Sequence, residues 1–249
     1  MTLLELIAQA KADNAKKLDL SKLDIRDLPD ELFELTQLEE LILDENNLVV
    51  LPDEIESLVN LTHLSVSEND LMELTPSLGK LTKLTALYLG YNGLTDLPPE
   101  IGELKELTML NVAKNSLLDI PKEIGDCEKL EKLSIHDNVL TELPKEVGQL
   151  KNLRKIYLDN NSLKSLPKEM GNLENLTELI ASGNFFTSIP AEFGKLKNLE
   201  ELVLDMNDIT RLPEELNNIP GIKCISVVNN PVSKIPDILK KHPGLKIEK

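Results

Sequence analysis

Aromatic residues are scarce in this sequence, and Trp is absent altogether. Phe, Trp and Tyr make up 3% of the chain, whereas hydrophobic residues as a class make up 41%. A core dominated by large rings is therefore excluded. The interior must be built from aliphatic side chains, mainly Leu and Ile.

Positive charge is also in short supply. The chain has 27 Lys and Arg against 43 Asp and Glu, which gives a net charge of −16. A surface of this sign repels phosphate backbones and anionic lipids. We therefore expect neither nucleic acid nor a membrane among the partners.

Catalytic and targeting motifs are missing as well. The sequence has no Gly-rich phosphate loop, no paired-His zinc motif, no C-x-x-C and no Ser nucleophile elbow. We expect a protein that is not an enzyme and that uses no metal or cofactor. The N-terminal segment lacks the basic start and long apolar run of a signal peptide. Two cysteines, Cys127 and Cys224, are too few for a disulfide framework, so we expect free thiols and a cytoplasmic protein.

What the sequence does contain is a repeat of 23 residues. One Asn recurs every 23 residues and marks each copy, as Asn92 does. A Pro follows this Asn by six positions in nearly every copy, as Pro98 does, and a Gly often follows it by ten, as Gly102 does. A fixed period of this length predicts a stack of similar units, because each unit can bury its apolar side only against its neighbours. The marker residues, spaced without an insertion, are Asn46, Asn69, Asn92, Asn115, Asn138, Asn161, Asn184, Asn207 and Asn230.

The unit from Leu84 to Glu106 shows what each copy predicts. Its first part reads L-x-x-L-x-L-x-x-N-x-L, and the alternation of Leu87 and Leu89 is typical of a short strand. Strands that recur in one direction can pair only in parallel. Pro98 suits the first position of a helical turn. The sequence therefore predicts an α/β solenoid with about ten parallel strands on its concave face and short helical turns on its convex face.

The Asn column is interpreted as structural. A buried Asn side chain can both donate to and accept from backbone groups of adjacent turns, so we expect the nine residues to form a polar ladder. A second column, which includes Glu100, resembles a row of paired carboxylates. Because it repeats in nearly every unit, stabilisation of helix ends explains it better than acid–base chemistry.

The two ends depart from the repeat. Residues Thr2 to Asn14 predict an amphipathic helix that covers the first unit, with Thr2 and Glu5 at capping-box spacing. The sequence H-P-G-L ending at Leu245 echoes I-P-G-I one period earlier, so a truncated strand is expected from Leu245 to Lys249. The expected organisation is a capping helix at 1–14, ten repeat units at 15–244 and a terminal strand or cap at 245–249.

The full consensus, L-x-x-L-x-L-x-x-N-x-L-x-x-L-P-x-E-I-G-x-L-x-x-L, resembles that of leucine-rich repeat proteins. Within them it is similar to the 23-residue class found in Ras-pathway scaffolds, Ras suppressor, plant intracellular Ras-group-related proteins and many bacterial repeat proteins. This resemblance implies a horseshoe-shaped solenoid that binds other proteins through its concave face. Bacterial ubiquitin-ligase effectors and receptor kinases of the superfamily carry a further catalytic domain, which we do not expect here because the repeat covers nearly the whole sequence.

Specificity is expected in strand columns that vary between units and face away from the core. Early units are acidic, as at Asp44 and Glu68, and later ones alternate apolar, aromatic and basic residues. His63 and His136 also lie in these columns, three units apart and too distant to share a metal; Asp137 and Asp159 are placed to orient His136. The predicted partner-binding residues are Tyr88, Tyr91, Met109, Lys132, Arg154, Lys155, Tyr157, Ile180, Phe185, Val203 and Met206. Tyr, Met and Arg are enriched at protein interfaces, although Tyr, Ile and Val also simply suit strands.

Two functions remain open from the sequence. The first is a non-enzymatic protein-interaction module, with a signalling enzyme such as a small GTPase as a partner suggested by family resemblance. The second is a structural or scaffold array, idealised in its regular spacing and without a dedicated partner. The unbroken repeat favours the second, and the uneven surface chemistry favours the first.

Overall fold

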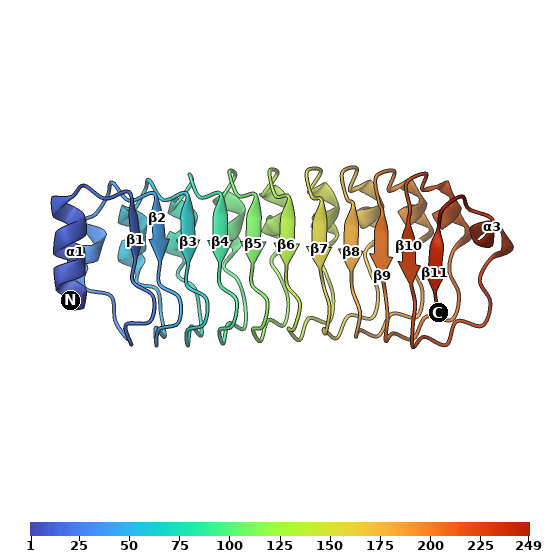
Figure 1. Ribbon diagram of the computed structural model, residues 1–249, viewed down its shortest axis with the longest axis horizontal. Helices are drawn as coiled ribbons and strands as arrows, with labels where there is room; N and C mark the ends of the chain where they lie inside the picture. The colour runs from blue at the N-terminus through green and yellow to red at the C-terminus, as the bar shows by residue number, and fades with distance from the viewer.

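A computed structural model describes residues 1–249 and shows one parallel sheet of eleven strands, arranged in chain order from β1 to β11. Figure 1 shows the strands side by side along the length of the molecule. Each strand is only three residues long. They are β1 (Lys17–Asp19), β2 (Glu40–Ile42), β3 (His63–Ser65), β4 (Ala86–Tyr88), β5 (Met109–Asn111), β6 (Lys132–Ser134), β7 (Lys155–Tyr157), β8 (Glu178–Ile180), β9 (Glu201–Val203), β10 (Cys224–Ser226) and β11 (Lys246–Glu248).

Short helical turns lie behind the sheet in this view (Figure 1) and return the chain from each strand to the next. The predicted turns are confirmed, and most are 3₁₀ turns of five residues, a type that proteins use in short pieces. Two are α-helical, α2 (Asp30–Phe33) and α3 (Asp237–Lys240). The 3₁₀ turns are η1 (Asp53–Ser57), η2 (Pro76–Lys80), η3 (Pro99–Glu103), η4 (Lys122–Asp126), η5 (Lys145–Gln149), η6 (Lys168–Asn172), η7 (Ala191–Lys195) and η8 (Glu214–Asn218).

The strand register follows the sequence period. Leu87 pairs with Leu110, one unit later, and the other strands from β1 to β10 keep the same offset. The last strand does not, because Cys224 pairs with Lys246, which is 22 positions later. The turn before it still follows the predicted echo, since the Leu245 N–H bonds the carbonyl of His242. The final coil is therefore one residue shorter between its turn and its strand.

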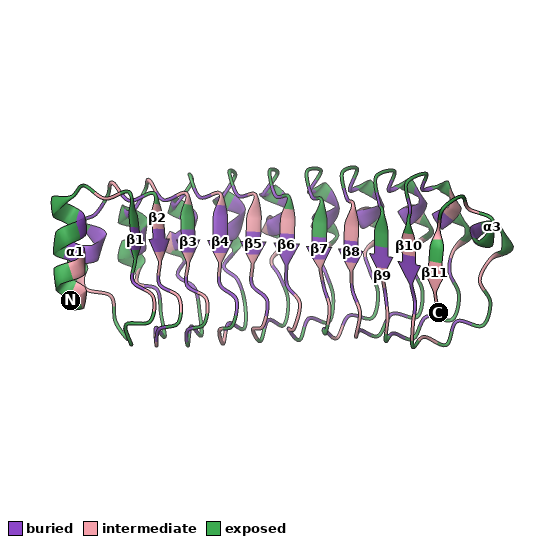
Figure 2. Cartoon of the chain, viewed as in Figure 1, coloured by how far each residue is buried: buried purple, intermediate pink, exposed green.

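The core is one continuous cluster of 69 buried residues that runs through the whole stack. It is almost entirely aliphatic, as the composition predicted, and Phe33, Phe186 and Phe193 are its only aromatic members. Figure 2 shows buried positions recurring at the same place in successive strands. Cys127, which replaces a Leu of the repeat, is buried in this core, and burial raises the pKa of its thiol to about 12.

The Gly column lets neighbouring turns pack closely. A Cβ on Gly148 would lie 2.4 Å from the backbone carbonyl oxygen of Glu169 in the next unit, well inside van der Waals contact. The equivalent glycines, such as Gly102, make the same close approach to the next Glu. The turn of each unit therefore packs through its Gly against the backbone of the Glu in the next unit.

Helix α1 (Leu3–Ala12) covers the N-terminal end of the sheet (Figure 1). Its start carries the capping box read from the sequence, because Thr2 Oγ1 accepts from the Glu5 N–H and the Glu5 carboxylate accepts from the Thr2 N–H. Ile7 and Ala10 are buried against the first units. The apolar end of the stack is closed on this side.

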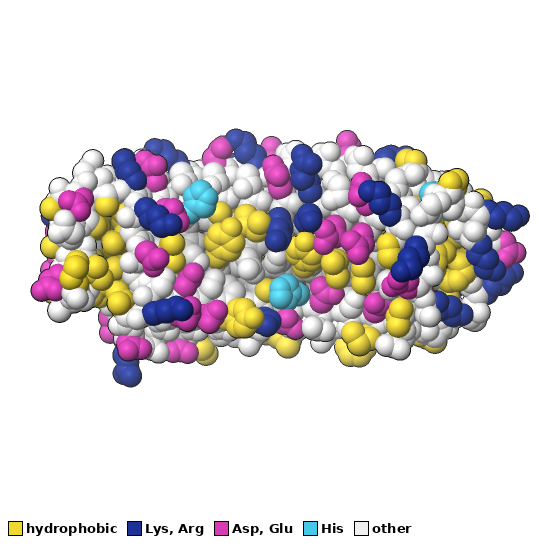
Figure 3. Space-filling model, viewed as in Figure 1, with side chains coloured by type: hydrophobic (Ala, Val, Ile, Leu, Met, Phe, Trp, Pro, Cys, Tyr) yellow, Lys and Arg dark blue, Asp and Glu magenta, His cyan; other side chains and the backbone are white.

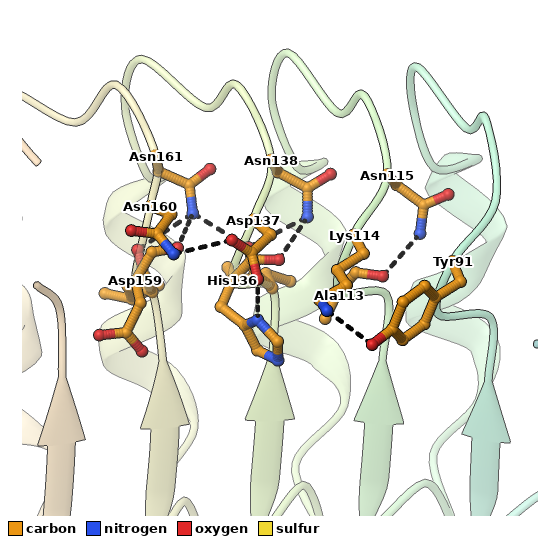
Figure 4. Close-up of polar contacts among 12 residues, drawn as sticks. Tyr91, Ala113, Lys114, Asn115, His136, Asp137, Asn138, Asp159, Asn160 and Asn161 are labelled. Atoms are coloured by element: carbon orange, nitrogen blue, oxygen red, sulfur yellow. Dashed lines mark hydrogen bonds and ion pairs between the residues drawn. The ribbon is translucent and has the colours of Figure 1, made fainter. Parts of the chain in front are cut away.

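The Asn column joins each unit to the one before it. Asn138 Oδ1 accepts from the Leu117 N–H at 3.0 Å, and its Nδ2 donates to the carbonyls of Val112 and Ile135 at 3.1 Å. All nine Asn side chains bond backbone groups in this way, and three of them, Asn115, Asn138 and Asn161, appear in Figure 4. Each amide therefore fixes the turn that follows a strand.

Candidate protein-binding face

The sheet surface turned away from the 3₁₀ turns is called the concave face here, and Figure 3 views it directly. One side chain from each strand forms its central column, at the position that follows the buried middle residue of the strand. Large and small residues alternate irregularly along it. From β2 to β10 the column reads Ile42, Ser65, Tyr88, Asn111, Ser134, Tyr157, Ile180, Val203 and Ser226.

The structure places most of the predicted site residues on this face. Seven of them, Tyr88, Met109, Lys132, Lys155, Tyr157, Ile180 and Val203, lie within strands β4 to β9, and Arg154 directly precedes β7. Tyr91 and Met206 instead lie in the turns after β4 and β9, at positive φ, and are about half exposed. Phe185 lies still further on, after Asn184, so it belongs to the rim and not to the strand surface.

Tyr91 is held by its neighbour in the next unit. The Lys114 ammonium donates to the Tyr91 hydroxyl at 2.6 Å and lies 4.2 Å from the centre of the ring. Figure 4 shows the two side chains directed toward each other along the rim. The pKa of Lys114 is raised, chiefly by this hydrogen bond. Tyr91 is therefore presented in a fixed orientation.

Tyr157 lies within a group of paired charges. Lys155 forms an ion pair with Glu178 at 2.8 Å, and the Lys132 ammonium lies 5.2 Å from the centre of the Tyr157 ring. The pKa of Tyr157 is raised, first by partial burial and then by its interaction with Glu178. These contacts hold the ring in place, and the charge of Lys155 is already paired.

Arg154 is also paired, with Glu131 at 3.5 Å. Neither carboxylate partner of Arg154 and Lys155 was predicted from the sequence. A signal was available, because Glu131 and Arg154 occupy the same column in adjacent units, as do Lys155 and Glu178. Residues 23 apart in a stack lie on neighbouring strands and can pair across them.

His136 is oriented by only one of the two predicted carboxylates. Its Nδ1 lies 2.8 Å from Asp137 Oδ2, and Asp137 accepts a second bond from Asn160 Nδ2 at 2.7 Å (Figure 4). Burial raises the pKa of Asp137, but these two bonds outweigh it and the net pKa is lowered. Asp159 bonds the Ser182 N–H instead, and its pKa is raised by burial.

The histidines do not form a site together. His63 is bonded to its neighbour Thr62, three units from His136. No group of three or more His, Cys, Asp or Glu side chains in the structure is arranged to hold a metal ion.

The acidic zone of the early units divides into paired and unpaired carboxylates. Glu39, Glu40 and Glu45 form ion pairs with lysines of the first unit, Lys16, Lys17 and Lys22, at 3.1, 2.7 and 2.8 Å. Asp44 and Glu68 have no cationic partner. Asp70, in the same zone, forms no ion pair either, so the net negative charge of the zone comes from these three carboxylates.

A hollow of about 340 Å³, which was not predicted from the sequence, opens in this zone on the concave face. It is lined by Ile42, Ser65 and Tyr88 of the central column, with Glu40, Asp44, His63 and Ser67 beside them. The signal was the small Ser65 between two large neighbours. The hollow occupies the space that a larger side chain would fill.

A larger hollow, about 650 Å³, lies away from this face, near the C-terminal end. The Leu-Pro turns of the last units line it. Arg211 and Lys234 lie on its wall with Glu214, Glu215 and Asp237, so charges of both signs surround it. None of the predicted site residues borders it.

The parallel sheet, the stacked 3₁₀ turns and the Asn ladder define a solenoid repeat protein with one open sheet face. Family models agree, because a leucine-rich repeat model matches residues 13–71 and 82–140, and a leucine-rich repeat region model matches residues 122–237. A leucine-rich repeat protein of Leptospira interrogans is 32% identical, with a TM-score of 0.87 over 96% of this chain and 68% of its own. The chain belongs to the leucine-rich repeat family.

Two similar solved structures are plant receptors with bound partners. The ectodomain of the Arabidopsis thaliana receptor kinase GASSHO1/SCHENGEN3, in complex with CASPARIAN STRIP INTEGRITY FACTOR 2, is 29% identical with a TM-score of 0.83. The plant peptide hormone receptor RGFR1, in complex with RGF2, is 32% identical with a TM-score of 0.76. This chain is covered to 93% and 94% in these comparisons but spans only 29% and 43% of the receptor chains.

No curated protein matches the chain significantly. No helix in the structure has both the length and the apolar character needed to span a membrane.

Proposed function

We propose that this protein is a non-enzymatic interaction module that binds a polypeptide partner on its concave face. The observation that carries the proposal is the contrast between the columns of the strands. The core columns repeat Leu or Ile in nearly every unit, whereas the central column changes from Ile42 to Ser65 to Tyr88 and onward. A face that only covered a core would have no reason to vary in this way.

Tyr88 and Tyr157 are the proposed anchors. A few well-packed aromatic residues usually dominate the free energy of binding at protein interfaces. Tyr157 is already held by Lys132 and by the pair of Lys155 with Glu178, so less side-chain freedom remains to be lost on binding. The two similar receptor structures, each solved in complex with a partner, support the same general use of the fold.

The partner class is proposed from family resemblance. The 23-residue class suggests a signalling protein such as a small GTPase, and a cytoplasmic site of action. Cys127 and Cys224 are free thiols, which suits a reducing compartment. Fractionation of the native cell, with an antibody against this chain, checks the compartment: recovery with secreted proteins would contradict it.

A pull-down with a matched control tests the site. The double variant Tyr88→Ala with Tyr157→Ala should lose the captured partner while keeping its urea unfolding midpoint, because both rings are partly exposed. Phe185→Ala removes an exposed ring from the rim and serves as the control. Capture that survives the double variant but not the control would move the site from the strands to the rim.

A second candidate is a structural array without a dedicated partner. The observation in its favour is that many ion pairs on and beside the strands join adjacent units, as Lys17 does with Glu40 and Lys223 does with Glu200. Such pairs stabilise the stack without any ligand. If wild type and the double variant recover the same set of proteins, this candidate is favoured.

A further inference from the structure

The hollow on the concave face has the size of a side-chain pocket. Its volume, about 340 Å³, is at the lower end of the range for ligand pockets, so it suits one long side chain better than a whole small molecule. Ile42 and Tyr88 contribute apolar surface, and Ser65 between them leaves the space open. The column accepts a Tyr elsewhere, at Tyr157, so the small residue at Ser65 is not required by the fold.

The charge of the pocket comes from Asp44. One of its oxygens, Oδ1, accepts from Ser65 Oγ at 2.6 Å and from the Ser67 N–H at 2.8 Å. These two bonds fix the carboxylate, while Oδ2 has no protein partner. The other carboxylate of the lining, Glu40, is already paired with Lys17. A fixed carboxylate with one free oxygen is suited to bind a cationic donor.

We propose that this pocket binds an arginine side chain of the partner. The guanidinium would bond the free oxygen of Asp44, its plane would lie against the Tyr88 ring, and its methylene stem would contact Ile42. Arginine fits better than lysine because a planar guanidinium both stacks on aromatic rings and donates in a fixed geometry. The unpaired Glu68 in the next unit adds attraction of the same sign.

This inference rests on the proposed function, since it names one element of the polypeptide that the concave face binds. It also restricts the polypeptide segments that could bind. The bound segment must carry an exposed arginine, with the rest of its chain continuing toward Tyr157 or toward the N-terminal end of the sheet.

The test uses the full chain, labelled with ¹⁵N, and two small probes. Nα-acetyl-arginine methylamide is titrated against Nα-acetyl-citrulline methylamide, which has nearly the same shape without the charge. The amide signals of Ser65 and Ser67 should shift in a saturable way with the arginine probe. Binding of the citrulline probe should be about tenfold weaker, because it loses a charge-assisted hydrogen bond.

The chain supplies a matched control for Asp44. Asp205 occupies the same column, and its Oδ1 accepts from Ser226 Oγ at 2.5 Å and from the Val228 N–H at 2.8 Å. Asp44→Asn should abolish binding of the arginine probe, whereas Asp205→Asn should leave it unchanged at the same structural cost.

A second variant tests the shape of the pocket. Ser65→Tyr fills the space and removes no charge from the lining; it loses the Ser65 Oγ bond to Asp44, but the Ser67 N–H still holds that carboxylate, and binding of the arginine probe should also be abolished. The urea unfolding midpoint and the circular dichroism spectrum confirm that the variant remains folded.

Equal affinity for the two probes, shifts that survive Asp44→Asn, or no shift at Ser65 and Ser67 would each overturn the arginine pocket. None of these results would affect the pull-down test of Tyr88 and Tyr157. If instead the arginine probe binds but the pull-down shows no specific partner, the pocket stands and the proposed polypeptide interaction fails.

Discussion

The contribution of the Asn ladder is best measured by Asn138→Leu. Leu has a similar size but offers no hydrogen bond, so the substitution removes four contacts from the centre of the stack at once. Nδ2 of Asn138 donates to the carbonyls of Val112, Ile135 and His136, and Oδ1 accepts from the Leu117 N–H.

The four lost contacts are not equivalent. The Val112 carbonyl also accepts from Asn115, and the Ile135 carbonyl also accepts from Asn161, so each keeps one partner after the substitution. The Leu117 N–H has no other acceptor. The expected cost is therefore dominated by one unsatisfied buried donor, at ~2 kcal/mol, and not by several such groups added together.

Urea unfolding and amide hydrogen exchange measure the two parts of this expectation. A loss of about 2 kcal/mol with a slope of about 2 kcal/mol per M lowers the unfolding midpoint by about 1 M. Exchange at the Leu117 amide should accelerate much more than at amides two units away. A midpoint shift of several M, or an unchanged Leu117 amide, would refute the single-donor account.

Three further predictions follow from local geometry. Gly148→Ala should lower the urea midpoint because its Cβ would meet a carbonyl oxygen at 2.4 Å, whereas Gly221→Ala, with its nearest atom at 3.9 Å, should not. Asp159→Asn should raise the melting temperature at pH 7, because burial raises the pKa of Asp159 and so penalises its ionised form in the folded chain; the gain should shrink as the pH falls through that raised pKa and vanish below the ordinary Asp value of 3.8, where Asp159 is neutral in both states. A thiol reagent should label Cys224 slowly in the native chain and Cys127 only after unfolding, since Cys127 is buried with a pKa of about 12; native labelling of both would contradict this.

The fold could be predicted because its determinants are local and repeated. A 23-residue period with a two-residue alternation around Leu87 and Leu89 leaves only a stack of parallel strands as a way to bury the apolar columns. The helical turns followed from Pro98 and its equivalents, although their 3₁₀ character did not. The register of β11 was not predictable either. The sequence similarity between the last two turns does not fix how many residues separate the turn from the strand that follows it.

The candidate face was predictable in composition but not in its contacts. Columns of the repeat identified which side chains lie on strands, but Tyr91 and Met206 lie in the turns after their strands, and Phe185 lies beyond the Asn turn. The ion pair of Arg154 with Glu131 was not predicted, because the partner of a charge in one unit becomes apparent only from the same column of the neighbouring unit. The pocket at Ser65 was not predicted either, because its signal, one small residue between two large ones in the same column, is not a recognised sequence motif.

The pattern of ion pairs on the concave face indicates where contacts with a partner contribute most to selective binding. Beside Tyr157, Lys155 and Glu178 are already paired with each other, and Lys132 lies over the ring. A ligand that binds there therefore gains contact area but few new ionic bonds. At Asp44, two hydrogen bonds to Oδ1 fix the carboxylate, and Oδ2 remains free for a ligand. The hollow beside it is a space that no side chain fills. Discrimination between partners should therefore depend more on the pocket than on the tyrosine. Conservative changes at the Asp44 pocket should alter which sequences bind, whereas changes at Tyr157 should weaken all of them alike.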